Sequence, residues 1–388
     1  MTAPVSLPPP DTARTTRPAW VEIDVAQWRR NWRLIRADMP PQLAFVGVVK
    51  DDAYGHGMVT AARLALGHGA RLLAVSTLAE AAELRDNGVA APVLVFGPRH
   101  PGELAWCVQH QLTCVVGDLA EVAPLAAAAA RAGRRLDVHL KVNTGLNRYG
   151  VPPEEAVALA GAILAEPALH LAGVFSHFAQ SDESDKTFAG TQLARFRTAL
   201  AALEARGIRV PLRHLGNTGG YLDLPQAHFD AVRLGLLPLG VFPSLPCRRI
   251  SGLRPVMAVK ARVAAIRQLA AGESVGYGMR YTAPGPRRIG VLPLGYGDGF
   301  PRLRNEGSVL LHGRRAPIVG GVSMDALFID LTDIPQAALW DVATLLGRDG
   351  DEEITARDLA QLKRSVGYDV LCGWRHRLPR REVDSAHE

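Results

Sequence analysis

Lysine is scarce in this sequence, and one lysine stands where an amine could act as a nucleophile. The chain of 388 residues holds only five lysines among its 44 lysine and arginine residues. Lys50 ends the apolar run 43–49 and precedes the polar, glycine-containing segment 51–57. An amine at the end of a buried strand loses part of its hydration, so its lone pair becomes more available. Lys50 could therefore form a Schiff base with an aldehyde, and the alternative is a lysine that reaches out to water.

Two other segments could bind the phosphate of an aldehyde cofactor. Residues 216–220 (Gly-Asn-Thr-Gly-Gly) follow a strand-like run, and the N–H groups and hydroxyl of such a turn can cradle a phosphate. Arg233 ends the next strand-like run, and Tyr54 adds a phenol just after Lys50. Together they indicate pyridoxal phosphate. An arginine facing the pyridine nitrogen would keep that nitrogen unprotonated, whereas the alternative for Arg233 is a pair with a carboxylate.

Further polar residues lie at predicted strand ends or in glycine turns. His177 ends a strand-like run, and a cofactor contact and a hydrogen-bonded core position explain it equally well. Lys141 and Arg148 are two close cations that need a counter-charge or strong solvation. Tyr277 stands between two glycines, and a phenol is a poor base unless a cationic neighbour makes it more acidic.

The periodicity of the chain predicts an α/β fold, a (β/α)8 TIM-type barrel followed by a mostly β C-terminal domain. Apolar strand-like runs alternate with amphipathic helical stretches such as 78–88, 119–133 and 187–207. The eight runs are 43–50, 71–77, 91–97, 112–118, 136–144, 171–178, 212–218 and 231–236. Sites in such barrels lie at the C-terminal ends of the strands.

The second half of the chain has a different rhythm. Short strand-like pieces separated by Gly, Pro and Asp turns occupy 256–269, 289–294, 308–312, 316–319, 327–331 and 368–372. The predicted organisation is a disordered N-terminal arm at 1–18, the barrel at 19–254 and the mostly β domain at 255–388. The arm is rich in Pro and Thr and lacks the apolar segment of a signal peptide.

Composition excludes several classes of protein. The charged fraction of 21% and hydrophobic fraction of 48% are those of an ordinary soluble globular protein. The net charge of +6 is spread along the chain without a basic, aromatic-interleaved stripe, which disfavours nucleic-acid binding, and no run is apolar enough to span a membrane. The four cysteines form no C-x-x-C, so we expect no metal site and a reducing, cytoplasmic compartment.

Five short motifs, in this order, resemble those of the alanine racemase family. They lie at 48–57, 141–148, 276–278, 295–299 and 323–325, and the resemblance runs from about residue 18 to residue 381. It implies a cytoplasmic isomerase of barrel-plus-β-domain architecture that interconverts L- and D-alanine with pyridoxal 5'-phosphate for peptidoglycan synthesis. It also implies a homodimer with composite active sites.

The resemblance implies a role for each matching residue. Lys50 would hold the cofactor and act as one base, and Tyr277 of the partner subunit would be the other base. Lys141 would be carbamylated and would hold Arg148, which would contact cofactor and substrate. Met324 of the partner subunit would bind the substrate carboxylate through its backbone N–H. The remaining cofactor contacts would be Tyr54, His177, Asn217, Thr218, Arg233, Gly235, Leu236 and Tyr368.

Alternatives remain at the level of the residues. Lys141 could face solvent while Arg148 pairs with Asp182. Departures from the usual family residues affect the pocket and its entrance, so a racemase of broader specificity is an alternative. These departures are Asp51, Tyr149, Thr218, Met279, Gly321 and the segment 236–239. A pyridoxal-phosphate carrier would lack the β domain, and a decarboxylase of the same barrel type would have a more glycine-rich phosphate loop.

Overall fold

The computed structural model describes residues 17–384, which divide into two compact units. One unit contains residues 24–256 and 383–384, and the other contains residues 17–23 and 257–382. Apart from Arg17 and Pro18, the predicted arm at 1–18 lies outside the described residues.

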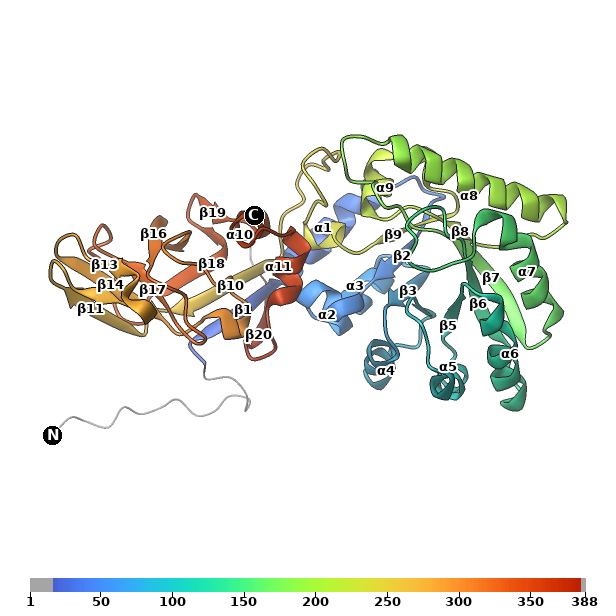
Figure 1. Cartoon of the computed structure of the whole chain (residues 1–388), viewed down its shortest axis with the longest axis horizontal. Coiled ribbons are helices and arrows are strands. Elements are labelled where there is room, and N and C mark those ends of the chain that lie inside the picture. Colours follow the sequence, from blue (N-terminus) through green and yellow to red (C-terminus); the bar gives the residue numbers. More distant parts are fainter. Residues whose placement is uncertain (1–16, 385–388) are drawn as a thin grey trace. The chain divides into compact units, whose positions relative to one another are not determined.

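The first unit is built around a closed barrel of eight parallel strands (Figure 1). Neighbouring strands pair in chain order, and the last strand closes on the first with Ala44 opposite Ala231. The strands are β2 (Ala44–Val48), β3 (Leu72–Val75), β4 (Val93–Val95), β5 (Thr113–Val116), β6 (Leu136–Lys141), β7 (Leu169–Phe175), β8 (Arg213–His214) and β9 (Ala231–Leu234). Each falls within or overlaps one predicted run, and the predicted barrel is confirmed.

Helices precede and connect the barrel strands (Figure 1), and most of them bury an apolar face. They are α1 (Val25–Asp38), α2 (Lys50–Gly55), α3 (Met58–Gly67), α4 (Leu78–Asp86), α5 (Leu104–Gln109), α6 (Val122–Arg131), α7 (Ala156–Ala165), α8 (Thr187–Ala205) and α9 (Thr218–Asp223). Local sequence sets their ends: Thr77 and Glu80 form a capping box that starts α4. Inside the barrel, Val46, Leu94 and Phe175 belong to a buried apolar cluster.

The second unit is dominated by a ten-stranded sheet in the order β11-β14-β17-β16-β15-β18-β10-β1-β20, with β19 on β18 and a separate β12–β13 hairpin. Its strands are β1 (Ala19–Asp24), β10 (Met257–Arg262), β11 (Ala265–Leu269), β12 (Ser274–Val275), β13 (Tyr281–Thr282), β14 (Arg287–Leu292), β15 (Ser308–Leu311), β16 (Arg314–Val319), β17 (Leu327–Asp330), β18 (Val342–Asp349), β19 (Glu352–Ile354) and β20 (Arg380–Val383). Two helices, α10 (Ala356–Lys363) and α11 (Gly367–Gly373), precede β20. The predicted mostly β character is confirmed.

Two details differ from the sequence-based expectation. The strand β1 pairs with β10 in the large sheet, so the barrel unit begins after this strand rather than at residue 19. The stretch 368–372 is helical within α11 and not a strand. A five-residue apolar run is too short for periodicity to separate the two states, and Asp369 in the first turn favours the helix.

Candidate active site

Lys50 follows the C-terminal end of β2 and begins an unusual turn. The four residues after it, 51–54, all have left-handed backbone angles with φ between 51° and 56°, and none is glycine. Each such residue costs roughly 1–2 kcal/mol, so the surrounding structure must hold the turn in place. Strain of this kind is concentrated at ligand-binding and catalytic sites, where it fixes a side chain that an ordinary helix would direct elsewhere.

Contacts from three directions hold this left-handed turn. The Asp51 N–H donates to Glu80 at 2.5 Å. The buried His56 ring donates from Nδ1 to the Tyr54 carbonyl at 2.9 Å, so its proton lies on Nδ1. The Tyr54 ring lies against Gly235 beyond β9, since a Cβ built on Gly235 would lie 2.8 Å from the Tyr54 hydroxyl oxygen. The turn thereby brings Tyr54 to the end of the last barrel strand.

Arg233, in β9, is buried and donates to neutral groups. Its Nη2 donates to the carbonyls of Ser176 and Leu215 at 3.0 Å each and to His177 Nδ1 at 2.8 Å. Its Nη1 donates to His214 Nδ1 at 3.0 Å. No carboxylate among residues 17–384 pairs with it, so the alternative of an arginine–carboxylate pair is wrong. Burial lowers the pKa of Arg233 to about 9, which leaves the guanidinium charged at neutral pH.

The histidines around Arg233 are held in defined neutral tautomers. A guanidinium can only donate, so His214 accepts on Nδ1 and donates from Nε2 to His139 Nδ1 at 3.0 Å. Burial lowers the pKa of His139 to about 3 and that of His214 well below its usual value. Burial, followed by the charge of Arg233, likewise holds the pKa of His177 well below its usual value. This histidine chain therefore orients Arg233 without adding charge to the site.

Lys141, at the end of β6, is only 5% exposed. Its Nζ lies 5.2 Å from the centre of the Phe175 ring and 5.5 Å from that of Tyr149. Burial and the neighbouring charge of Arg148 lower its pKa to about 8. The alternative in which Lys141 faces solvent is therefore wrong, and within the described chain no ion pair joins Arg148 to Asp182.

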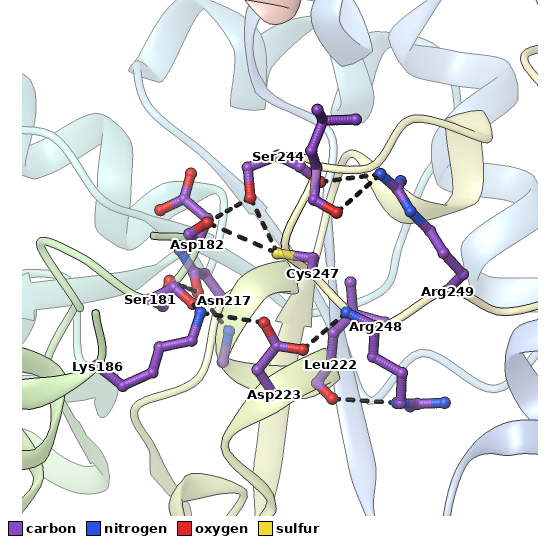
Figure 2. Close-up of polar contacts among 12 residues, drawn as sticks. Ser181, Asp182, Lys186, Asn217, Leu222, Asp223, Ser244, Cys247, Arg248 and Arg249 are labelled. Carbon is purple, nitrogen blue, oxygen red and sulfur yellow. Dashed lines mark hydrogen bonds and ion pairs between the residues drawn. The ribbon is translucent and has the colours of Figure 1, made fainter. Parts of the chain in front are cut away.

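The turn before α9 is organised by Asn217. Its Oδ1 accepts from the Gly220 N–H at 2.9 Å and from the Ser181 hydroxyl at 2.7 Å (Figure 2 shows the latter). Thr218, which follows it, is buried. Gly219 leaves no room for a side chain, because a Cβ there would lie 2.8 Å from Ser181 Oγ. The backbone N–H groups at the start of α9 thus keep a fixed direction.

Three predicted site residues belong to the other unit. Tyr277 is 82% exposed and stands between Gly276 and Gly278, whose φ angles of 80° and 71° favour glycine. Met324 is 52% exposed, and its N–H donates no hydrogen bond within residues 17–384. Tyr368 lies on α11 and is 38% exposed.

The remaining predicted residues share one end of the barrel, at or just beyond the C-terminal ends of its strands or in the loops that follow. These are Lys50, Tyr54, Lys141, Arg148, His177, Asn217, Thr218, Arg233, Gly235 and Leu236. Sequence reasoning missed the pairing of His139 with His214, since the two lie 75 residues apart on β6 and β8. Two histidines inside apolar strands were the only available signal. It also missed Ser181, a loop serine with no local motif.

Comparison with known proteins covers both units. The family models "Alanine racemase, N-terminal domain" and "Alanine racemase, C-terminal domain" match residues 23–243 and 256–382. The alanine racemase of Syntrophobacter fumaroxidans is 42% identical over 355 residues, which is 91% of this chain and 94% of that protein. The chain belongs to the alanine racemase family. The predicted activity, racemisation of alanine by an isomerase, is confirmed by these relatives.

Solved structures of the family agree with the architecture. The alanine racemase of Clostridium difficile 630 superposes with a TM-score of 0.91 at 30% identity, covering 96% of this chain and 97% of that one. A histidine racemase from Leuconostoc mesenteroides subsp. sake has a TM-score of 0.87 at 29% identity, covering 96% and 99%. The alanine racemase fold therefore also occurs in a protein named for a different amino acid.

Proposed function

We propose that this chain interconverts L- and D-alanine with bound pyridoxal 5'-phosphate, using Lys50 and Tyr277 as bases on opposite faces of the substrate Cα. When bound, this cofactor supplies an electron sink that acidifies the Cα proton. One observation carries the proposal: Lys50, Arg233 and the Asn217 turn share the barrel end at which such folds hold their active sites.

The residues present fit this cofactor. A phosphate needs several donors and a close backbone approach, which the turn before α9 offers through fixed N–H groups, a hydroxyl and glycines without side chains. The residues that would hold the phosphate are Tyr54, Thr218, Gly235, Leu236 and Tyr368, with Asn217 beside them. At the other end of the site, the buried donors of Arg233 suit an aromatic nitrogen that accepts a hydrogen bond.

Arg233 would face the pyridine nitrogen, with His177 beside it. Because the guanidinium keeps its proton, that nitrogen would remain neutral and the electron sink would be moderate. The neutral His139–His214 pair supports this role, because His214 only accepts a hydrogen bond from Arg233 and presents no proton to it. The arrangement would suppress side reactions that need a longer-lived carbanion.

Inversion at Cα requires one group to remove a proton and another to supply one from the opposite face. Lys50 would act on one face and the phenol of Tyr277 on the other. Tyr277 is highly exposed and belongs to a different compact unit from Lys50. We therefore propose a homodimer in which Tyr277 and Met324 of the partner subunit complete each site, with the free Met324 N–H binding the substrate carboxylate.

Lys141 would carry a carbamate formed with carbon dioxide. Carbamylation needs a neutral amine, and the lowered pKa of Lys141 supplies a larger neutral fraction than an exposed lysine has. The product is an anion that would attract Arg148 and hold it against the cofactor oxygen and the substrate.

The biological setting follows from this activity. We propose a cytoplasmic enzyme of D-alanine biosynthesis that supplies peptidoglycan precursors and has neither nucleic acid nor membrane as a partner. None of the helices among the described residues is long and apolar enough to cross a membrane.

The experiment that tests the proposal is racemisation by the purified, cofactor-loaded protein across a panel of L-amino acids. We expect the highest kcat/KM with alanine. The second candidate, a broader racemase, is favoured by the histidine racemase on the same fold, by Met279 two positions after Tyr277, and by Gly321, which lines the same pocket as Tyr277. A higher kcat/KM with another amino acid would replace alanine as the preferred substrate.

A further inference from the structure

We infer that Lys186 positions the phosphate-binding turn at the start of α9 by joining both ends of that helix. The inference rests on the proposed function, because that proposal places the cofactor phosphate at Asn217 and Thr218. Lys186 is one of the five lysines of the chain and takes no part in the chemistry described above.

Lys186 has two partners on different segments. Its Nζ donates to the Ser181 carbonyl at 2.6 Å and pairs with Asp223 Oδ2 at 3.0 Å (Figure 2). The Ser181 hydroxyl in turn donates to Asn217 Oδ1 at 2.7 Å. Asn217 caps the start of α9, and Asp223 is the last residue of this helix. The contacts therefore form a closed ring that runs from the Lys186 ammonium through Ser181 and Asn217, along α9 to Asp223, and back to the ammonium.

The Asp223 side of the ring is itself anchored. The second oxygen of Asp223 accepts from the Arg248 N–H at 2.9 Å. The Arg248 guanidinium pairs through two bonds of 2.8 Å with both oxygens of Asp38. Tyr221, within α9, donates to the same Asp38 carboxylate at 2.6 Å. The last turn of α9 is therefore fixed. Lys186 links this turn to the loop that carries Ser181, because its ammonium group bonds to both.

The Ser181 side determines how the phosphate turn is presented. Asn217 Oδ1 accepts from both Ser181 and the Gly220 N–H, so a shift of Ser181 changes the cap of α9. The ion pair of Lys186 and Asp223 is partly shielded, with 26% and 12% of the two side chains exposed. It should hold the loop more firmly than a fully exposed pair would. Removing the ammonium should weaken the phosphate contacts and leave those to the pyridine ring unchanged.

The test compares two ligands that differ only in the phosphate group. The dissociation constants of pyridoxal 5'-phosphate and of pyridoxal are measured by titration of the cofactor-free full chain and of Lys186→Met. We expect the affinity for pyridoxal 5'-phosphate to fall about ten-fold, as expected for the loss of roughly one good hydrogen bond, while that for pyridoxal stays the same. The matched control is Lys260→Met, because the Lys260–Glu22 pair is similarly exposed (26% and 20%) but belongs to the other unit.

Comparing the affinities for pyridoxal 5'-phosphate and pyridoxal distinguishes a loss of positioning at the phosphate turn from a general destabilisation of the protein. Equal loss for both ligands, or no loss for either, would overturn the inference, whatever happens to the melting temperature. If Lys186→Met does not fold, Asp223→Asn gives the same test, since it keeps an acceptor for Arg248. A wild-type protein that binds both ligands equally would instead refute the phosphate site of the proposed function.

Discussion

The surroundings of Lys141 determine how strongly its ammonium form is disfavoured in the folded protein. The fold lowers the pKa of this amine from 10.5 to about 8. At about 1.4 kcal/mol for each pH unit, the buried ammonium is disfavoured by about 3 kcal/mol. At pH 7 about one amine in ten is then neutral, against about one in three thousand for an ordinary lysine. The site therefore supplies the nucleophile for carbamylation and gains stability when the cation becomes an anion beside Arg148.

We expect the stability of the wild-type protein to depend on carbon dioxide. In depleted buffer at pH 7 the ammonium returns, and the free energy of unfolding should fall by up to about 3 kcal/mol, measured by denaturant titration with and without bicarbonate. Without carbamate, stability should rise between pH 8 and pH 10.5, because the unfolded chain keeps the proton to higher pH than the fold does. Labelled bicarbonate should give a carbamate signal by carbon-13 NMR.

Lys141→Met is the decisive variant. It should lose most racemisation because Arg148 is no longer held, and it should no longer respond to carbon dioxide. The shorter side chain of Lys141→Ala leaves space for a small carboxylate, so that variant should recover some activity with added acetate. Lys260→Met should keep the wild-type response. Two results together would refute the reasoning, because they would show that Lys141 is a bare ammonium. In bicarbonate at pH 7, Lys141→Met would be about 3 kcal/mol more stable than the wild type, and the wild type would give no signal of labelled carbamate.

Three other outcomes follow from the same site. Arg233→Glu should racemise more slowly and give a larger share of transamination product, and an unchanged product ratio would remove Arg233 from the pyridine nitrogen. Mixing inactive Lys50→Ala with inactive Tyr277→Phe should restore part of the activity through one intact site per mixed dimer; no recovery despite proven subunit exchange would argue against a composite site. Gly235→Ala places a Cβ 2.8 Å from the Tyr54 hydroxyl and should weaken cofactor binding roughly ten-fold by equilibrium titration, whereas unchanged affinity would contradict the phosphate role of this position.

Sequence periodicity predicted the barrel because the apolar runs are short and amphipathic helical stretches separate most of them. It also placed Lys50 and Arg233 at the same end, since the C-terminal ends of parallel strands meet there. Periodicity could not predict which strands pair when they lie far apart in the sequence. The pattern of β1, for example, does not reveal that its partner is β10.

The sequence predicted those site residues whose chemical type and place at a strand end indicate a role. It did not predict features of the site that depend on backbone conformation or on contacts between distant segments. The left-handed turn at 51–54 contains no glycine, so only the following Gly55 and Gly57 hint at it. The ring that joins Lys186, Ser181 and Asp223 depends on contacts between residues up to 37 positions apart, and no local motif marks them.

The measurement that tests the central claim most directly is the location of the bound cofactor on the chain. The wild-type protein loaded with pyridoxal 5'-phosphate is reduced with borohydride, digested and analysed by mass spectrometry. The pyridoxyl group should be found on Lys50 with loss of the visible absorption band, and Lys50→Ala should show neither the label nor appreciable racemisation. A label on another lysine, or wild-type turnover in Lys50→Ala, would contradict the account.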